Sequence, residues 1–143
     1  MKDTLADIRD KLRNGSYQNE EHVRLSLVAR ILQQLEWNIW NPKEVYAEFV
    51  AVPSEDRTKV DVALFVTPYT PSVFIEIKAP GKITNLHEIE RQLRDYNRNI
   101  LVPFCVITDG NTWRFYYSRA SGEFSGKCFK VLSLSSDDLD DIE

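Results

Sequence analysis

The sequence predicts a single α/β (α+β) domain in which helices flank one central mixed β-sheet. Its 143 residues are enough for one hydrophobic core and short for two. Two helical segments come first, and short strands rich in Val, Ile, Phe and Tyr follow, with a third helix among them. No internal repeat, low-complexity tract or linker divides the chain, so we expect one domain over residues 1–143.

Three segments have the apolar spacing of amphipathic helices. Residues 3–13 carry apolar side chains three and four positions apart, and Asn14-Gly15 ends the pattern. Asn19 is placed to cap a second helix that runs to about Glu36, with an acidic first turn. A third helical pattern covers residues 86–99. The second helix has a broad apolar face, which suits packing on a sheet. Its apolar positions are Val23, Leu25, Leu27, Val28, Ile31, Leu32 and Leu35.

Short apolar runs between turn residues predict six strands. Asp109-Gly110 is a tight hairpin signal between two of them. We expect the core to extend over about residues 17–134, and the acidic tail, residues 137–143, to be solvated or frayed. The predicted strands are residues 45–52, 60–66, 73–78, 102–108, 112–117 and 128–134.

Composition limits the function classes. The net charge of −4 argues against a strongly basic coat for nucleic acid, although a local basic groove remains compatible with it. Cys105 and Cys128 lie in apolar strand segments and are expected to be reduced core thiols. No signal-peptide pattern and no apolar run of about 20 residues occurs, so we expect a cytoplasmic protein without a membrane partner. The chain has no phosphate-binding loop of the ATPase type, so we expect no ATP.

Three charged residues interrupt strands that otherwise read as buried: Asp61, Glu76 and Lys78. Alternate residues of a strand share a face, so Glu76 and Lys78 point the same way. A charge within an apolar strand needs a partner, water or a metal. One interpretation is a metal site. The other is structural: Asp61 marks the start of a strand, and Glu76 and Lys78 form an ion pair on an edge strand.

A metal site of this composition suits Mg²⁺, with Mn²⁺ as an alternative. Two carboxylates from neighbouring strands are hard oxygen ligands, and Mg²⁺ is commonly held by one or two carboxylates together with several waters. Such a metal lowers the pKa of bound water and stabilises charge on a phosphate, and a neighbouring lysine adds to that stabilisation. The residues therefore indicate metal-assisted phosphodiester hydrolysis.

A wider set of segments resembles the N-terminal nuclease domain of type I restriction enzyme R subunits, in the PD-(D/E)xK nuclease superfamily. Their order and spacing along residues 17–117 carry the resemblance. It implies a restriction-endonuclease-like core, here as a stand-alone domain without the motor of the full R subunit. The segments are residues 19–24 (NEEHVR), 59–64 (KVDVAL), 74–81 (FIEIKAPG), 92–96 (QLRDY), 102–110 (VPFCVITDG) and 113–116 (WRFY).

The resemblance also implies roles for individual residues. Asp61 and Glu76 would ligate the metal, assisted by the carbonyl of Ile77, and Lys78 would be the catalytic base or charge stabiliser. Glu20 would reach the site from the long helix, as a water-mediated ligand or to orient Lys78. If that helix is rotated, Glu21 takes this place; alternatively, Glu20 only complements the helix dipole.

Five residues of the third helix are candidates for DNA contact. Gln92 and Tyr96 share a helix face, and in the family such residues line the DNA channel. Arg91, Arg94 and Arg98 form a basic stripe that would contact phosphates without reading sequence. The alternatives are a helix packed by Leu93 and Tyr96 with Gln92 exposed, and a stripe of solvated charges.

The sequence thus leads to a first hypothesis, a Mg²⁺-dependent DNA endonuclease related to restriction enzymes. Its expected partners are DNA and either a second copy of the chain or other restriction-modification subunits. The second hypothesis is a non-catalytic DNA- or protein-binding module that keeps the nuclease fold. The third is an α/β domain in which the charged residues only form ion pairs within strands.

Overall fold

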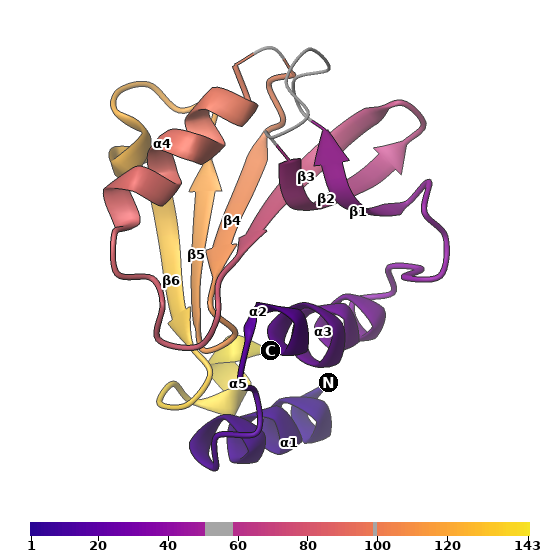
Figure 1. Cartoon of the computed structure of the whole chain (residues 1–143), viewed down its shortest axis with the longest axis vertical. Helices are drawn as coiled ribbons and strands as arrows, with labels where there is room; N and C mark the ends of the chain where they lie inside the picture. Colours follow the sequence, from indigo (N-terminus) through magenta and orange to yellow (C-terminus); the bar gives the residue numbers. More distant parts are fainter. Residues whose placement is uncertain (51–58, 99) are drawn as a thin grey trace.

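A computed structural model describes residues 1–50, 59–98 and 100–143 of the chain. It is a mixed α+β domain with one six-stranded sheet in the order β1-β2-β3-β4-β5-β6 (Figure 1). Strands β3 and β4 are parallel, and the other neighbouring pairs are antiparallel. The helices are α1 (Lys2–Arg13), α2 (Glu20–His22), η1 (Val23–Val28), α3 (Ala29–Gln34), α4 (Leu86–Tyr96), η2 (Phe124–Lys127) and α5 (Leu139–Ile142). The strands are β1 (Val45–Val50), β2 (Lys59–Thr67), β3 (Thr70–Ile77), β4 (Phe104–Thr108), β5 (Thr112–Tyr117) and β6 (Cys128–Ser133).

All six predicted strands are present, with ends that differ from the prediction by a few residues. The last two residues of the first predicted strand, 51 and 52, lie outside the described residues, as does position 99 at the end of the third predicted helix. Strand β3 begins at Thr70, three residues earlier than predicted, because it continues to pair with β2 up to the turn.

The predicted second helix is confirmed as the continuous run α2, η1 and α3. The side chain of Asn19 accepts a hydrogen bond from the amide of His22 and caps its start. Its middle, η1, is π-helical, with the amide of Ala29 bonded to the carbonyl of Arg24 five residues back. No helix among the described residues is long and apolar enough to cross a membrane.

The apolar face of this helix is narrower than predicted. Leu25 is 75% exposed and Leu35 is 54% exposed, so neither belongs to the core. Leu25 lies two residues from both of its buried neighbours and therefore on the opposite side of the helix. Leu35 follows the last helical residue. The buried positions are Val23, Leu27, Val28, Ile31 and Leu32.

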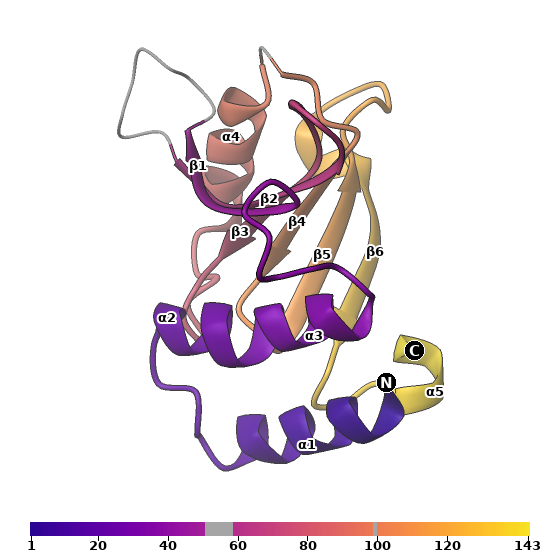
Figure 2. The same cartoon turned by 90° about the vertical axis from the view of Figure 1, so that its right-hand side faces the viewer.

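The two faces of the sheet pack against different helices (Figure 2). Ile75 and Ile77 of β3 share one apolar cluster with Leu27 of the long helix. Phe74, which alternates with them, belongs to a second cluster with Leu93 of α4. Residues at the end of β3 can therefore be reached from two helices.

The β4–β5 hairpin turns at Gly110, close beneath the long helix. Gly110 has a φ of +91°, and a Cβ atom there would lie 2.9 Å from Cδ1 of Leu27 and 3.3 Å from Cγ1 of Val23. Glycine is required here both for the backbone conformation and for this approach. The indole N–H of Trp113 donates to the Gly110 carbonyl at 2.8 Å, which fixes the turn.

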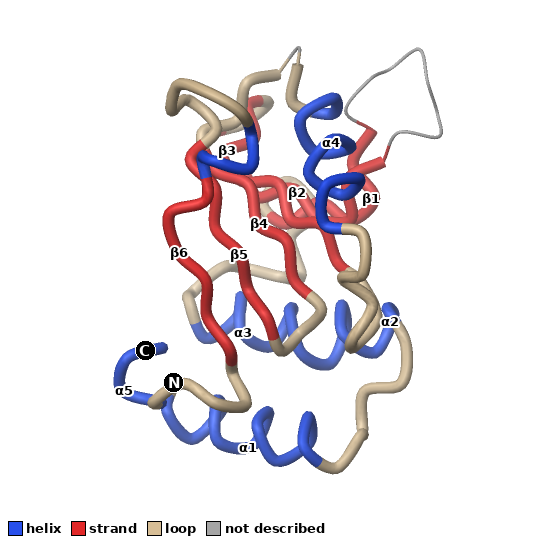
Figure 3. The backbone as a smooth tube through the Cα atoms, turned by 90° about the vertical axis from the view of Figure 1, so that its left-hand side faces the viewer, coloured by secondary structure: helices blue, strands red, loops and turns tan. Residues whose placement is uncertain are grey.

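The acidic tail, residues 137–143, folds back on the N-terminal helix, and the two termini lie side by side (Figure 3). Asp140 forms a 2.6 Å ion pair with Lys2. Leu139 and Ile142 pack against the core cluster of the long helix. The carboxylates of α5 are solvated as predicted, but a frayed tail is wrong, because these two apolar side chains anchor a helical turn.

The cysteine thiols are free, as predicted. Cys105 is buried in β4, and burial raises the pKa of its thiol to about 12. Cys128, at the start of β6, is only partly buried, so it is not the core residue that the sequence suggests.

Candidate metal centre

The start of β2 lies beside the end of β3. Val62 pairs with Ile75, and one residue further along the two antiparallel strands the side chain of Asp61 lies beside that of Glu76. Directly opposed residues of antiparallel strands have neighbouring side chains on one face. The amide of Ile77 donates a 2.7 Å hydrogen bond to Oδ2 of Asp61. The two carboxylates are therefore adjacent, and one of them is fixed by the backbone.

Glu76 is a buried carboxyl with an unused oxygen. Glu76 is 4% exposed, and its Oε2 has no hydrogen-bond partner among the described residues. Burial, followed by the adjacent carboxylate of Asp61, raises the pKa of Glu76 to about 10, although Lys78 opposes the shift. Without a cation, Glu76 therefore keeps its proton at neutral pH. A cation bound between the two carboxylates would take the place of that proton.

Lys78 directly follows β3 and is partly buried. Its amide donates to the carbonyl of Thr108 at 2.9 Å, which continues the pairing with β4. Its ammonium group partly offsets the rise in the pKa of both Glu76 and Glu20, so its positive charge acts on both carboxyls. The interpretation as an ion pair on an edge strand is wrong, because β3 lies inside the sheet between β2 and β4.

Glu20, the first residue of α2, belongs to the same electrostatic cluster. Burial, followed by the charge of Asp61, raises its pKa, and Lys78 lowers it. Glu21 instead forms an ion pair with Arg24, and its side chain is 67% exposed. The long helix therefore directs Glu20, and not Glu21, toward the carboxylates of the strands.

Tyr96 of helix α4 lies near the carboxyl groups of Glu76 and Asp61. Burial raises the pKa of Tyr96 to about 12, and the charges of Glu76 and Asp61 add to the shift. Gln92 lies one turn earlier on the same face and is partly buried. Of the alternative, the packing of α4 by Leu93 and Tyr96 is present, whereas Gln92 is only partly exposed.

The predicted basic stripe is exposed and locally neutralised. Arg91 pairs with Glu88 and Asp95, and both Arg94 and Arg98 pair with Asp95 at 3.3 Å. The three guanidinium side chains are 52–72% exposed, where such pairs contribute little and exchange readily. These arginines can therefore bind a phosphate only if their ion pairs with Glu88 and Asp95 break.

The donor set fits a hard divalent cation with few protein ligands. Within residues 1–50, 59–98 and 100–143, no three His, Cys, Asp or Glu side chains lie close enough to hold an ion together. The chain offers two adjacent carboxylates, Asp61 and Glu76, and the rest of a coordination sphere would be backbone and water. Mg²⁺ accepts this arrangement, whereas structural Zn²⁺ takes four protein ligands.

A second polar network was not predicted from the sequence. Glu90 of α4 is 4% exposed, and the hydroxyl of Tyr116 donates to its Oε2 at 2.6 Å. Arg114 donates in turn to the Tyr116 oxygen at 3.2 Å. Burial, followed by the bond to Glu90, raises the pKa of Tyr116. The network joins α4 to β5. Its signal in the sequence was the position of Glu90, three residues before Leu93 and therefore on the same buried face of α4.

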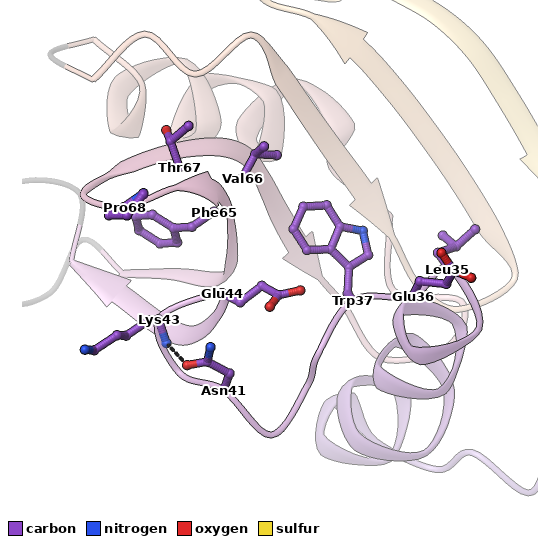
Figure 4. Close-up of a pocket in the computed structure, with 10 residues that line it drawn as sticks. All are labelled: Leu35, Glu36, Trp37, Asn41, Lys43, Glu44, Phe65, Val66, Thr67 and Pro68. Carbon is purple, nitrogen blue, oxygen red and sulfur yellow. Dashed lines mark hydrogen bonds between the residues drawn. The ribbon is translucent and has the colours of Figure 1, made fainter.

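A hollow of about 660 Å³ lies elsewhere. It opens between the end of the long helix and the β2–β3 turn, with Trp37 and Phe65 on its walls (Figure 4). Neither Asp61, Glu76 nor Lys78 lines it. The candidate centre is therefore separate from this hollow.

A family model described as "Type I restriction enzyme R protein N terminus" matches residues 19–127, more than half of the chain. The chain belongs to this family. It is thus a restriction-enzyme-related domain, as its sequence motifs indicated. The match to the R protein N terminus includes every residue of the candidate centre and all of α4, whereas α1, β6 and α5 lie outside it. Searches of curated proteins and of solved structures gave no match.

Proposed function

We propose that this R protein N-terminal domain is a Mg²⁺-dependent deoxyribonuclease that hydrolyses phosphodiester bonds in DNA. The observation that carries the proposal is the adjacency of Asp61 and Glu76, with an unpartnered buried oxygen on Glu76. A buried carboxyl beside a second carboxylate is costly without a cation, and sites with strongly shifted pKa values are frequently functional.

In this proposal Asp61 and Glu76 hold Mg²⁺ or Mn²⁺, with the carbonyl of Ile77 as a further ligand. When bound, the metal supplies an activated water and stabilises charge on the phosphate. The hydrogen bond from the Ile77 amide holds Asp61 in place, so little reorganisation is needed on binding.

Lys78 places a positive charge beside the scissile phosphate, where it stabilises the charge that develops during attack. Glu20 faces Lys78 and Asp61 from the long helix and orients the lysine or the attacking water. Gln92 and Tyr96 contact the DNA backbone next to the centre. The exposed stripe of Arg91, Arg94 and Arg98 extends this contact along α4.

The topology supports a restriction-endonuclease-like core of the PD-(D/E)xK type. The acidic residue of β2 meets the Glu-x-Lys segment of the adjacent antiparallel strand β3, and β4 continues the sheet in parallel. Helices pack on both faces of these strands. This arrangement places the two carboxylates and Lys78 at the end of β3, within reach of two helices.

A second candidate is a DNA- or protein-binding module without turnover. Two observations favour it: the net charge of −4 and the pairing of the basic stripe with Glu88 and Asp95. Its partners would be DNA, a second copy of the chain or other restriction-modification subunits.

Nicking of supercoiled plasmid in Mg²⁺ or Mn²⁺ distinguishes the two candidates. We expect wild type to nick, and Lys78→Ala to lose at least about 100-fold in rate, as for removal of a group that stabilises transition-state charge. Lys130→Ala, which removes an exposed lysine of β6, should nick like wild type. Retention of DNA in gel shifts without nicking in either metal would support the binding module instead.

A further inference from the structure

We propose that Asp109 is a positioning residue for Lys78, an inference that rests on the proposed function. Asp109 opens the β4–β5 turn and is only 7% exposed. The sequence identifies it merely as the first residue of a hairpin turn. Its carboxylate, however, accepts hydrogen bonds from three backbone amides, two in its own turn and one 28 residues away in sequence.

The two carboxylate oxygens of Asp109 have different partners. Oδ1 accepts from the amides of Asn111 at 3.0 Å and Thr112 at 2.8 Å, which are bonds within the turn. Oδ2 accepts from the amide of Gly81 at 3.1 Å, 28 residues away in sequence. An aspartate that only shapes a turn needs the first two bonds. The bond to Gly81 serves another purpose.

The bond to Gly81 holds the segment that begins with Lys78. At the start of this segment, the Lys78 amide is bonded to the carbonyl of Thr108. At its end, Gly81 is bonded to Asp109, the next residue after Thr108. Only two residues, Ala79 and Pro80, lie between these two anchors, so the backbone that carries the lysine is fixed on both sides. Such support matters for a long flexible side chain, because small displacements of a charged group reduce catalysis.

The same turn also supports the helix that carries Glu20. Gly110, adjacent to Asp109, lies directly beneath Val23 and Leu27, about one and two turns after Glu20. The Asp109-Gly110 turn therefore lies between the segments that carry Lys78 and Glu20, and it sets their relative position.

Asp109→Asn separates the positioning role from the turn. Asparagine keeps one oxygen for the two amides of the turn, but its NH₂ group faces the Gly81 amide and cannot accept from it. We expect cooperative unfolding with Tm lowered by no more than about 4 °C. We also expect hydrogen exchange at Gly81 to be at least tenfold faster. The kcat for plasmid nicking should fall about tenfold, while the KM for DNA changes less than twofold.

Asp137→Asn is the matched control, since Oδ2 of Asp137 accepts a backbone amide, that of Ser133, at 2.7 Å away from the centre. It should leave exchange at Gly81 and kcat unchanged. Unchanged Gly81 exchange in Asp109→Asn, or faster exchange with wild-type kcat, would overturn the proposal. If wild type nicks no DNA, the proposed function fails, and the Lys78 amide resonance decides about Asp109. A resonance that moves in Asp109→Asn but not in Asp137→Asn supports positioning, and one that stays in place overturns it.

Discussion

The amide N–H of Ile77 donates a 2.7 Å hydrogen bond to Oδ2 of Asp61, which ties a side chain of β2 to the backbone of β3. The bond occupies one oxygen of Asp61 and orients the other beside Glu76. An asparagine at position 61 can keep this bond through its own oxygen while removing the charge. The charge of the carboxylate pair can therefore be tested without breaking the link between the strands.

Glu76→Gln should stabilise the metal-free protein at pH 7. The folded-state pKa of Glu76 is about 10, above its ordinary value of 4.5, so the folded chain keeps a proton that the unfolded chain has lost. Between these two values, stability falls as the pH rises, by at most about 3 kcal/mol at pH 7. We expect a gain of roughly 1–3 kcal/mol for the variant and a flatter pH dependence in thermal denaturation.

The control for this variant is Glu123→Gln, which changes an exposed glutamate in the same way. It should follow the wild-type pH profile. A Glu76→Gln protein that is less stable than wild type at pH 7 without metal would contradict a buried, protonated Glu76.

Glu20→Gln should lower kcat for nicking by about 10–100-fold while the affinity for the metal changes little, because Glu20 acts beside the carboxylate pair and not as a direct ligand. Glu21→Gln, one residue further along, is the control, since Glu21 pairs with Arg24 at the surface. Steady-state kinetics and calorimetry on both variants provide the check. If Glu20→Gln and Glu21→Gln were equally active, Glu20 would have no role in catalysis.

Gly110→Ala should cost about 2–4 kcal/mol, because the new methyl group meets Leu27 and Val23 and the backbone conformation is strained. Gly122→Ala has a similar φ of +99° but no heavy atom within 4 Å, so it carries the strain alone, about 1–2 kcal/mol. Urea denaturation measures both. Equal losses of stability in the two variants would mean that Leu27 and Val23 do not pack closely against Gly110.

Replacement of both Arg94 and Arg98 by alanine should weaken DNA binding about tenfold, because two phosphate contacts are lost. The plot of the logarithm of the DNA association constant against the logarithm of the salt concentration should become less steep by about 2. Arg119→Ala, which removes an exposed arginine outside α4, should leave the slope unchanged. Fluorescence anisotropy at several salt concentrations, with Ca²⁺ in place of Mg²⁺, gives the slopes. A double variant with the wild-type slope would place the DNA elsewhere.

The adjacency of Asp61 and Glu76 could be predicted from the sequence, because each interrupts an apolar strand and the predicted strand of Asp61, residues 60–66, contains no cation. Helix and strand positions followed from periodicity and turn residues for the same local reason. The roles of these residues in metal binding and catalysis remain predictions.

Tertiary relationships could not be predicted. The bond from Gly81 to Asp109 and the network of Glu90 and Tyr116 join segments 26 or more residues apart, which no local pattern contains. The packing of Leu139 and Ile142 on the core likewise depends on where the chain returns, and the acidic sequence of the tail by itself predicts only a solvated or frayed end.

Calorimetric titration of Mn²⁺ into the metal-free protein is a direct test of the proposed metal centre. We expect one site in wild type, proton release on binding at pH 7 as Glu76 ionises, and at least about tenfold weaker binding in Asp61→Asn. Asp10→Asn, an exposed position of α1, should bind like wild type. No binding to wild type, or equal binding to wild type and Asp61→Asn, would contradict a metal centre between β2 and β3.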